Sequence, residues 1–396
     1  MPPDPSKLRA VVEHLQAIER PPASNGERRA AEWIRDRLAE HGCRARVEQE
    51  RATGSFPLPF ALLSAIAAAA GLSRGGRPLA AAGGLAAAAA IADDVSSGPR
   101  LFRRLLPARA TYNVVAEAGD PGADETVVFA AHHDAARGGL IFHPGPTRWV
   151  ADTFPAWYAR QETSPRLMQL VVAGPALAGA GALLGLPRVR RAGGVMALGT
   201  VLAMADIAAR AVVPGANDNL ASVALLIELA RLLRDEPPAG VRVLLVSTGS
   251  EESLLEGMRG FVARHAGALP RERTRFVVLE CVGGPEAIVL EGEGMLRMHD
   301  YTPAVRDWLA ACGERAGHPL RRGLRSGFAT DALVALKAGY PTGVLAAIDR
   351  YKMAPNYHSP RDVAANLDLG TVAATTAVCL EAIRSLSPRP APAPGR

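Results

Sequence analysis

At 396 residues with 48% hydrophobic content, the chain can bury a sizeable core and is within the range of one α/β domain with insertions. Its net charge of +6 comes from scattered arginines, and no basic run is interleaved with aromatics, so we expect no nucleic-acid partner. The four cysteines form no CxxC pair, which argues against a zinc knuckle or a redox motif and fits reduced thiols in the cytoplasm.

The N-terminal region predicts two helices and a strand. Residues 1–20 read as a polar helix with one apolar face and without the apolar core of a signal peptide, so we expect a cytoplasmic or cytoplasmic membrane-associated protein. Ser24 stands three residues before Glu27, which is the spacing of a capping box at the start of a second helix. Gly42 ends that helix, and a strand over residues 44–49 follows.

Further strand-like runs recur along the chain, at residues 112–116, 126–131, 241–247, 275–282, 287–290 and 343–347. Helical patterns separate several of them, and the clearest covers residues 221–234. This alternation predicts an α/β fold with a mostly parallel central sheet flanked by helices on both faces. We expect one domain over residues 1–386 and a disordered Pro-rich tail over residues 387–396.

Two stretches, residues 58–98 and 140–210, interrupt this rhythm, and each is predicted to form an inserted apolar helical hairpin. The Gly/Ala spacing of residues 174–185 suits close helix packing, and we hypothesise that the hairpins pack on each other as one subdomain. Each hairpin pairs two uncharged segments around an arginine-containing turn: 58–73 with 78–92, and 168–187 with 192–205.

Membrane entry by these hairpins stays open from the sequence. A span needs about 20 apolar residues, and only the segment that starts at Met168 approaches that length. The basic turns also prefer the cytoplasmic side, which would place the rest of the chain outside, so full spanning is the less favoured interpretation. Shallow membrane association of the hairpins and a soluble helical cap over the functional site remain, and they weigh about evenly.

The strand over residues 126–131 delivers the sequence His132-His133-Asp134 at its carboxyl end, where ligands gather in open α/β sheets. Alternation places His132 and Asp134 on one side, so Asp134 can accept a hydrogen bond from the His132 ring and fix its tautomer. An HxD sequence alone is more often part of a surface loop. It gains weight from the groups that follow.

Asp218 opens the helix that begins at residue 221, where it would commonly be a plain N-cap, although its two oxygens could also bridge two cations. Glu251 and Glu252 follow a buried strand, and adjacent carboxylates repel each other unless a cation or a proton lies between them. Glu280 interrupts an apolar strand, where an unpaired carboxylate is costly to bury. Alternation points Cys281 to the opposite face, so we do not choose it as a ligand.

His358 lies in a loop before the C-terminal helix and completes a series in fixed order. The series supplies two imidazoles and three carboxylates, the donors that a pair of Zn²⁺ ions needs. The candidate metal ligands are His132, Asp218, Glu252, Glu280 and His358.

This pattern resembles the co-catalytic zinc peptidases, a family that includes bacterial leucyl aminopeptidases, glutamate carboxypeptidase and glutaminyl cyclases. The resemblance covers the chain except for the two hairpins and the tail. The matching stretches are SNGERRAAEWIRDRLAEHG, NVVA, VVFAAHHD, PGANDNLASVALLIELAR, VLLVSTGSEESLLEG, FVVLECVGG, TDALVALKAGYPTG and YHSPRD. Many members of the family have Asp where Glu280 stands, so the spacing of the metals is the point that this departure puts in doubt.

The resemblance implies that His132 and Glu280 bind one zinc ion, that Glu252 and His358 bind the other, and that Asp218 bridges both. It also implies that Glu251 is the general base for a water held between the ions, with Asp134 in a supporting role. The expected activity is that of a zinc-dependent aminopeptidase acting on peptide substrates.

Two alternatives remain: a glutaminyl-cyclase-like acyltransferase and a catalytically inactive, membrane-associated binding protein. Cyclisation in this family uses one zinc ion and a tryptophan-lined pocket, whereas this chain retains both histidines and has only four tryptophans, at positions 33, 149, 157 and 308. The retained Glu251 argues against an inactive protein. Residue specificity, the native metal and the oligomeric state do not follow from the sequence.

Overall fold

The computed structural model describes residues 2–387, so the predicted tail lies almost entirely outside the described residues. The sheet has nine strands in the order β1-β2-β4-β3-β5-β9-β6-β7, with β8 paired to β6. The strands are β1 (Arg44–Ala52), β2 (Arg109–Gly119), β3 (Glu125–His132), β4 (Val241–Thr248), β5 (Thr274–Glu280), β6 (Glu286–Glu293), β7 (His299–Asp300), β8 (Arg321–Ser326) and β9 (Thr342–Ile348).

The four central strands β4, β3, β5 and β9 run parallel, while β1, β2 and β6 join them in antiparallel pairs. The predicted α/β fold with a mostly parallel central sheet is therefore confirmed. Strand β8 escaped prediction because it is rich in arginine and has no apolar alternation. Its Arg322 instead pairs with Glu291 of the neighbouring strand β6.

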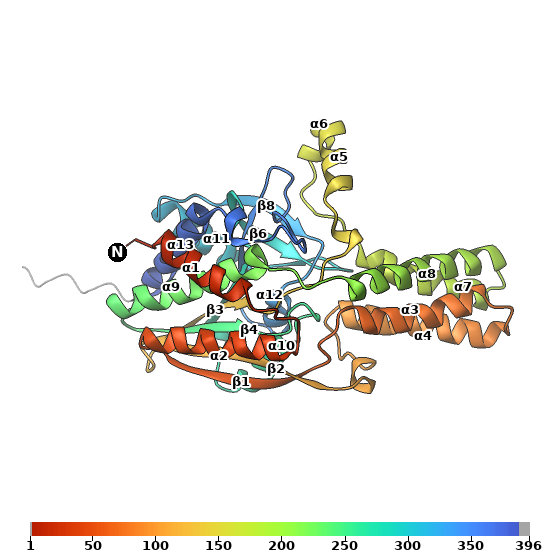
Figure 1. Cartoon of the computed structure of the whole chain (residues 1–396), viewed down its shortest axis with the longest axis horizontal. Coiled ribbons are helices and arrows are strands. Elements are labelled where there is room, and N and C mark those ends of the chain that lie inside the picture. Colours follow the sequence, from red (N-terminus) through yellow and green to blue (C-terminus); the bar gives the residue numbers. More distant parts are fainter. Residues whose placement is uncertain (1, 388–396) are drawn as a thin grey trace, which may run out of the picture.

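Helices cover both faces of the sheet (Figure 1). One face carries α1, α2, α9, α11 and α13, and the other carries α10 and α12. The helices are α1 (Pro5–Gln16), α2 (Asn25–Glu40), α3 (Pro57–Leu72), α4 (Arg77–Val95), α5 (Gly145–Thr153), α6 (Pro155–Ala159), α7 (Met168–Leu183), α8 (Pro187–Ala209), α9 (Ala221–Asp235), α10 (Glu256–His265), α11 (Pro303–Arg315), α12 (Asp331–Lys337) and α13 (Leu369–Leu386).

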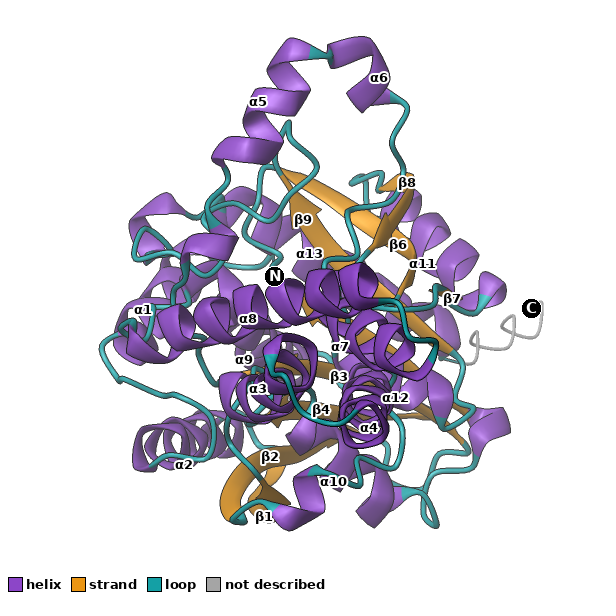
Figure 2. Cartoon of the chain, turned by 90° about the vertical axis from the view of Figure 1, so that its right-hand side faces the viewer, coloured by secondary structure: helices purple, strands orange, loops and turns teal. Residues whose placement is uncertain are grey.

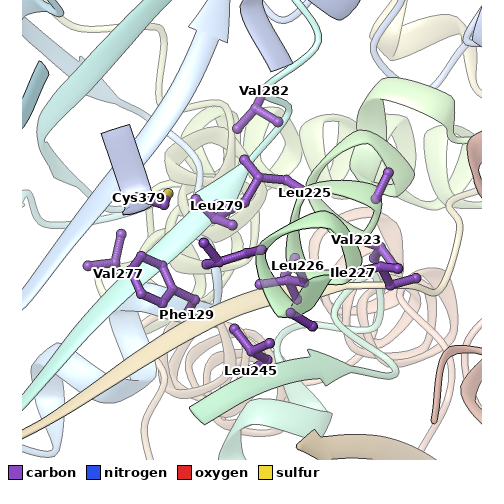
Figure 3. Close-up of a cluster of buried hydrophobic side chains, with 14 of the residues drawn as sticks. Phe129, Val223, Leu225, Leu226, Ile227, Leu245, Val277, Leu279, Val282 and Cys379 are labelled. Atoms are coloured by element: carbon purple, nitrogen blue, oxygen red, sulfur yellow. The ribbon is translucent and has the colours of Figure 1, made fainter. Parts of the chain in front are cut away.

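Alternation along the central strands divides the core into two layers. Val127 and Phe129 of β3 join the cluster under α9, whereas Val128 and Ala130 join the cluster under α10 and α12. Figure 3 shows Leu226 of α9 among the side chains of the first layer. Because both faces of the sheet are covered, the middle of each parallel strand is apolar, and the polar side chains lie near the strand ends.

Helices α3 and α4 pack against α7 and α8 to form a four-helix bundle, which projects from one end of the sheet (Figure 1). Figure 2 looks onto the free end of this bundle. The segment 140–210 contains more than a hairpin, because α5 and α6 precede α7 and extend as a separate arm. The bundle points away from the sheet rather than folding over it as a lid.

Candidate metal centre

The five predicted ligands come together at the carboxyl edge of the parallel strands. His132 ends β3, Glu280 ends β5, and Glu252 follows β4 within four residues. Asp218 stands in the turn before α9, and His358 in the loop between β9 and α13. Within residues 2–387, two groups of these ligands have all their ligand atoms within 4.8 Å of one another, and a third such group joins His132 and Glu252 to Glu251.

Asp218 lies at the middle of the cluster. Its Oδ1 is 3.1 Å from His132 Nε2, and its Oδ2 is 3.2 Å from His358 Nε2. His132 Nε2 also lies 3.7 Å from Glu280 Oε1, and His358 Nε2 lies 3.2 Å from Glu252 Oε2. The side chains thus form two triads that share Asp218, in the grouping that the family resemblance implies.

The donor set fits metal ions better than hydrogen bonding among the side chains. Asp218 Oδ2, Glu252 Oε1 and His358 Nε2 are buried, yet none of them makes a well-aligned hydrogen bond among the described residues, although His358 Nε2 lies 3.2 Å from Asp218 Oδ2. Two imidazoles face the carboxylates of Asp218, Glu251, Glu252 and Glu280, so the cluster has an excess of negative charge. Nitrogen and carboxylate oxygen donors of this kind suit Zn²⁺.

The electrostatics of the cluster also favour a bound cation. Burial disfavours a charge on His358, but Glu252 and Asp218 outweigh it and raise its pKa to about 10. Burial likewise opposes protonation of His132, whereas Glu251 and the nearby carboxylates raise its pKa well above the ordinary value. The excess of carboxylates therefore favours a positive charge among these groups, and a metal ion would supply it in place of protons.

Glu251 belongs to neither triad. Its Oε2 lies 4.0 Å from His132 Nε2, so the carboxylate borders the cluster without contributing to the shared Asp218 groups. Burial raises its pKa well above the ordinary range, and the neighbouring Glu280 and Glu252 add to this rise while His132 opposes it. A carboxylate in such surroundings binds a proton readily, which is what a general base must do.

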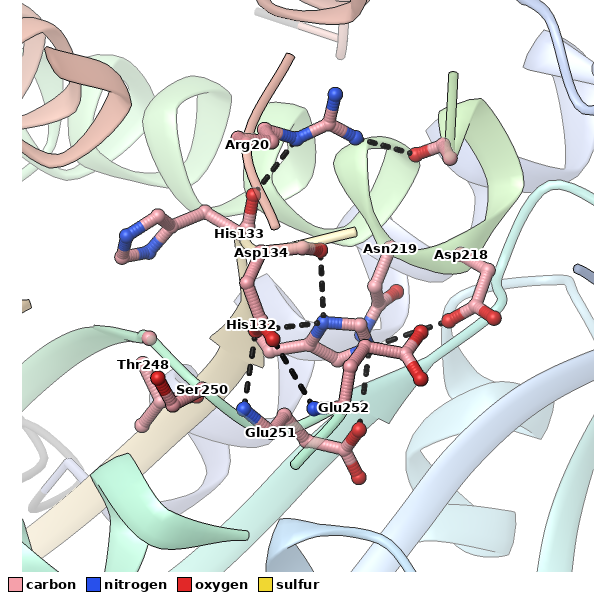
Figure 4. A network of polar contacts seen from close by, with 12 residues as sticks. Arg20, His132, His133, Asp134, Asp218, Asn219, Thr248, Ser250, Glu251 and Glu252 are labelled. Atoms are coloured by element: carbon pink, nitrogen blue, oxygen red, sulfur yellow. Dashed lines mark hydrogen bonds and ion pairs between the residues drawn. The ribbon is translucent and has the colours of Figure 1, made fainter. Parts of the chain in front are cut away.

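Asp134 contacts two parts of the cluster and holds them in place (Figure 4). Its Oδ1 lies 3.4 Å from His132 Nδ1, as the alternation along the strand predicted. The same carboxylate also accepts hydrogen bonds of 3.0 Å from the backbone N–H groups of Glu251 and Glu252. Asp134 therefore fixes the imidazole and the following glutamate pair together, and the sequence indicated only the first of these contacts.

Asp362 and Arg20 position the Asp218 turn, and sequence reasoning assigned a role to neither. The Asp362 carboxylate accepts hydrogen bonds from the backbone N–H groups of Asn217 at 2.7 Å and Asp218 at 3.1 Å. Buried Arg20 donates to the carbonyls of His133 and Pro214, both at 2.7 Å, and so joins the β3 end to this turn. No local pattern marks these contacts, because they link distant parts of the chain.

Glu27 is a further buried carboxylate that the sequence interpretation placed only in a capping box. Ser24 does cap α2 by accepting from the Glu27 backbone N–H, and the Glu27 side chain reaches back to accept from Ala23 N at 2.7 Å, but this side chain also makes tertiary contacts. Its Oε1 accepts from Thr111 Oγ1 and Tyr112 N, and its Oε2 accepts from Ser250 N and Oγ. Glu27 shares the buried face of α2 with the apolar Ile34, and that periodicity could have revealed it.

We expect Glu27→Gln to lower kcat/KM about 10- to 100-fold, the range for residues that support metal-site groups. The glutamine amide nitrogen cannot accept from Ser250 or Tyr112, so the loop that carries Glu251 loses its fixed position. Steady-state kinetics, zinc content and Tm would be compared with those of Glu19→Gln, which changes an exposed glutamate nearby. A lower Tm with unchanged kcat would reduce Glu27 to a purely structural role.

The Cys281 side chain points in a different direction from the one predicted. The strand was predicted to continue to residue 282, which would have turned this side chain away from Glu280. Strand β5 instead ends at Glu280, and Cys281 has a positive φ of 52°. Its thiol lies 3.3 Å from Glu280 Oε1 and donates to it, and burial raises the thiol pKa well above its ordinary value. The cysteine therefore supports Glu280 as a protonated donor, and the alternation argument fails because the strand is shorter.

Comparisons with known proteins bear on the family and the fold. Residues 198–383 match the model of peptidase family M28. A Zn-dependent exopeptidase from Parabacteroides distasonis has a similar fold, with a TM-score of 0.57, 15% identity, and coverage of 97% of this chain and 99% of that one. A glutaminyl cyclase from Bacteroides thetaiotaomicron gives a TM-score of 0.56 at 14% identity, covering 97% and 98%.

An aminopeptidase from an Aneurinibacillus species gives a TM-score of 0.56 at 13% identity, covering 97% of this chain and 94% of that one. At such low identity, these likenesses show the fold and not the activity. No curated protein matches the sequence. Taken with the match to family M28, the shared fold confirms the resemblance that the sequence motifs indicated.

Proposed function

We propose that this chain, whose residues 198–383 match peptidase family M28, is a zinc-dependent aminopeptidase that hydrolyses N-terminal residues from peptides. The family match supports the coarser statement, a metallopeptidase. The observation that carries the finer one is the placement of Asp218, which directs one oxygen toward each of two histidine-containing triads. A binding protein without catalytic activity would have no need to keep Glu251 beside such a cluster.

Two metal ions fit the donor set. His132 and Glu280 would hold one, Glu252 and His358 the other, and Asp218 would contact both. When bound, zinc supplies Lewis acidity, which polarises a scissile carbonyl and lowers the pKa of water to about 7.

The protein's own groups would move the protons. Glu251 would accept a proton from the attacking water and later pass it to the leaving amine. Asp134 would hold the backbone of Glu251 and the ring of His132 in place while this happens, since it contacts both. Glu251 would thus transfer protons, while other side chains would hold the metal ions.

Cyclisation is less well supported than hydrolysis. The sequence analysis linked that activity to a tryptophan-lined pocket, and the four tryptophans of this chain have other surroundings. Trp33 stacks on His14, and Trp308 donates to Ser385. Trp149 and Trp157 are exposed on the α5–α6 arm.

We expect zinc-loaded protein to release free amino acids from unblocked dipeptides and aminoacyl anilides, and not from their N-acetylated forms. A free amine can bind beside the carboxylates of the cluster, whereas an acetylated one has no charge to offer. Equal cleavage of both forms would contradict aminopeptidase action. Ring closure of glutaminyl peptides without hydrolysis would favour the cyclase alternative instead. A chelator-treated sample provides the metal control.

A further inference from the structure

The bundle of α3, α4, α7 and α8 has its large apolar side chains on the outside. All four helices contribute to this surface, so it surrounds the bundle rather than forming one patch. The exposed residues are Leu58, Leu62, Ile66, Leu72, Leu79, Leu85, Leu170, Leu177, Leu183, Val195, Leu198 and Leu202.

Small residues fill the inside of the bundle toward its free end, where Ala70, Ala80, Ala81 and Ala182 form the buried cluster, while large side chains such as Phe60 and Ile91 are buried only at the end nearest the sheet. A Cβ added at Gly71 would lie 2.4 Å from the Gly194 Cα, and one at Gly84 would lie 2.5 Å from the Gly179 backbone nitrogen. The helix backbones therefore touch. In water, burial of large apolar side chains drives folding, whereas helices in lipid associate through small residues and leave large ones facing the acyl chains. The bundle has the second distribution.

A helix of the catalytic domain provides a comparison. By length and composition alone, α4, α8 and α13 are each long and apolar enough to cross a membrane. Helix α13 packs its apolar residues into the core of the sheet layer. The buried share of the most apolar stretch is 44% in both α13 and α4, and only 28% in α8. Helix α8 therefore leaves most of its apolar stretch uncovered by the protein.

Charges are confined to the two ends of the bundle. The free end carries Arg74 in the turn between α3 and α4, Arg77 at the start of α4, and Arg188, Arg190 and Arg191 at the start of α8. Asp93, Asp94 and Asp206 lie at the end nearest the sheet. Arg190 donates to the carbonyls of Ala70 and Ser73 at the end of α3, and Arg77 donates to those of Ala182 and Leu183 at the end of α7. The arginines therefore satisfy helix carbonyls at the level where lipid headgroups would begin.

The length of the uncharged segments fits a bilayer with modest adjustment. Helix α3 has 16 residues without charge, so it spans about 24 Å at 1.5 Å per residue, against about 30 Å of hydrocarbon. Long arginine side chains and slight local thinning of the bilayer can cover a difference of this size. The sequence criterion of about 20 apolar residues was applied to one segment at a time, whereas the four helices of the bundle would enter a bilayer together.

The α5–α6 arm starts at the end of the bundle nearest the sheet and extends sideways from the bundle axis (Figures 1 and 2). Trp149, Phe154 and Trp157 on this arm are 63%, 52% and 52% exposed. Tryptophan prefers the membrane–water interface, where its ring contacts the acyl boundary and its N–H stays wet. The arm lies where that interface would meet a bundle standing upright in a bilayer.

We propose that the α3–α4–α7–α8 bundle crosses a lipid bilayer, with the catalytic domain and the aromatic arm at one surface and the arginine-containing turns at the other. Lipid is the occupant rather than a second copy of the chain, because a dimer contact covers one face, and the exposed leucines lie on all four helices. The bundle is independent of the proposed catalytic activity, so either can fail without the other.

Cysteine accessibility tests the proposal directly. The four native cysteines are buried and unpaired, so a cysteine introduced at Gly75 in the first free-end turn, or at exposed Ala39 on α2, would react selectively. In sealed membrane vesicles from expressing cells, we expect a membrane-impermeant maleimide to label only one of the two positions until detergent opens the vesicles. Labelling of both positions from the same side would overturn spanning.

Extraction and charge variants provide a second measurement. We expect the full chain to stay in the membrane through alkaline carbonate, and its membrane fraction to fall about tenfold in Leu198→Glu/Leu202→Glu, where two carboxylates would face hydrocarbon. The matched variant Ala10→Glu/Ala39→Glu adds the same charge to exposed positions of the catalytic domain and should stay bound. Release of the unaltered protein by carbonate, or its recovery as a soluble dimer, would refute the proposal.

Discussion

Replacing Glu251 by glutamine is expected to lower kcat about 10²- to 10⁴-fold, the contribution typical of a positioned general base, while zinc content stays near normal. Glutamine keeps the shape of the side chain but cannot take the proton of the attacking water. Zinc should remain bound because both triads around Asp218 are complete without Glu251. Kinetics on an aminoacyl anilide and elemental analysis of the same sample measure the two quantities.

The control for this experiment is Glu314→Gln, which removes an exposed carboxylate from α11 and should change neither quantity. The two readouts separate the alternatives. Unchanged turnover in Glu251→Gln would remove Glu251 from proton transfer. A parallel loss of zinc and activity would instead make Glu251 a metal ligand. The geometry allows this role, because ligand atoms of His132, Glu251 and Glu252 lie within 4.8 Å of one another.

The position of the candidate ligands could be predicted because it depends on local rules. His132 and Glu280 end apolar strands, and parallel strands place their carboxyl ends at one edge of the sheet. Neither rule needs knowledge of distant contacts. The order of the ligands along the chain then sufficed to indicate the cluster.

The groups that hold the ligands in place could not be predicted in the same way. Glu27 contacts Ser250 across 223 positions, and Asp362 contacts Asp218 across 144. At Glu27, a local pattern even concealed the role, since the capping-box spacing accounted for the residue without any tertiary contact. Cys281 shows the converse error, where a strand extended by two residues reversed the inferred direction of a side chain.

The packing of the two hairpins on each other follows the hypothesis drawn from the sequence, but the side chains that face outward could not be predicted. Each apolar segment was judged alone against the length of a bilayer, although the four helices share their charge-free zone. The contact between Gly71 and Gly194, more than a hundred positions apart, is what shows that small residues face inward. Composition alone cannot separate such a bundle from α13, which is equally apolar and lies in the core.

Asp218→Asn is expected to have the other large effect, the loss of zinc from both triads together with activity. Asp218 is the residue that the triads share, and an amide offers one neutral oxygen in place of two charged ones. We expect zinc affinity to fall by more than the 10- to 100-fold typical of residues that only support a ligand. Asp362→Asn, which weakens the hold on the Asp218 backbone, should fall within that smaller range.

Asp124→Asn completes the series, because Asp124 is exposed and pairs only with Arg273 on the surface. Zinc per chain after dialysis and the zinc-dependent rise in Tm should rank Asp218→Asn as most affected, then Asp362→Asn, with Asp124→Asn unchanged. A ligand that binds only the folded state stabilises it by an amount that grows with the logarithm of its affinity. If Asp218→Asn kept one zinc ion at full affinity, the triads would be independent sites. Asp218 would then belong to one metal alone, and the proposed pairing of the metals through it would have to be given up.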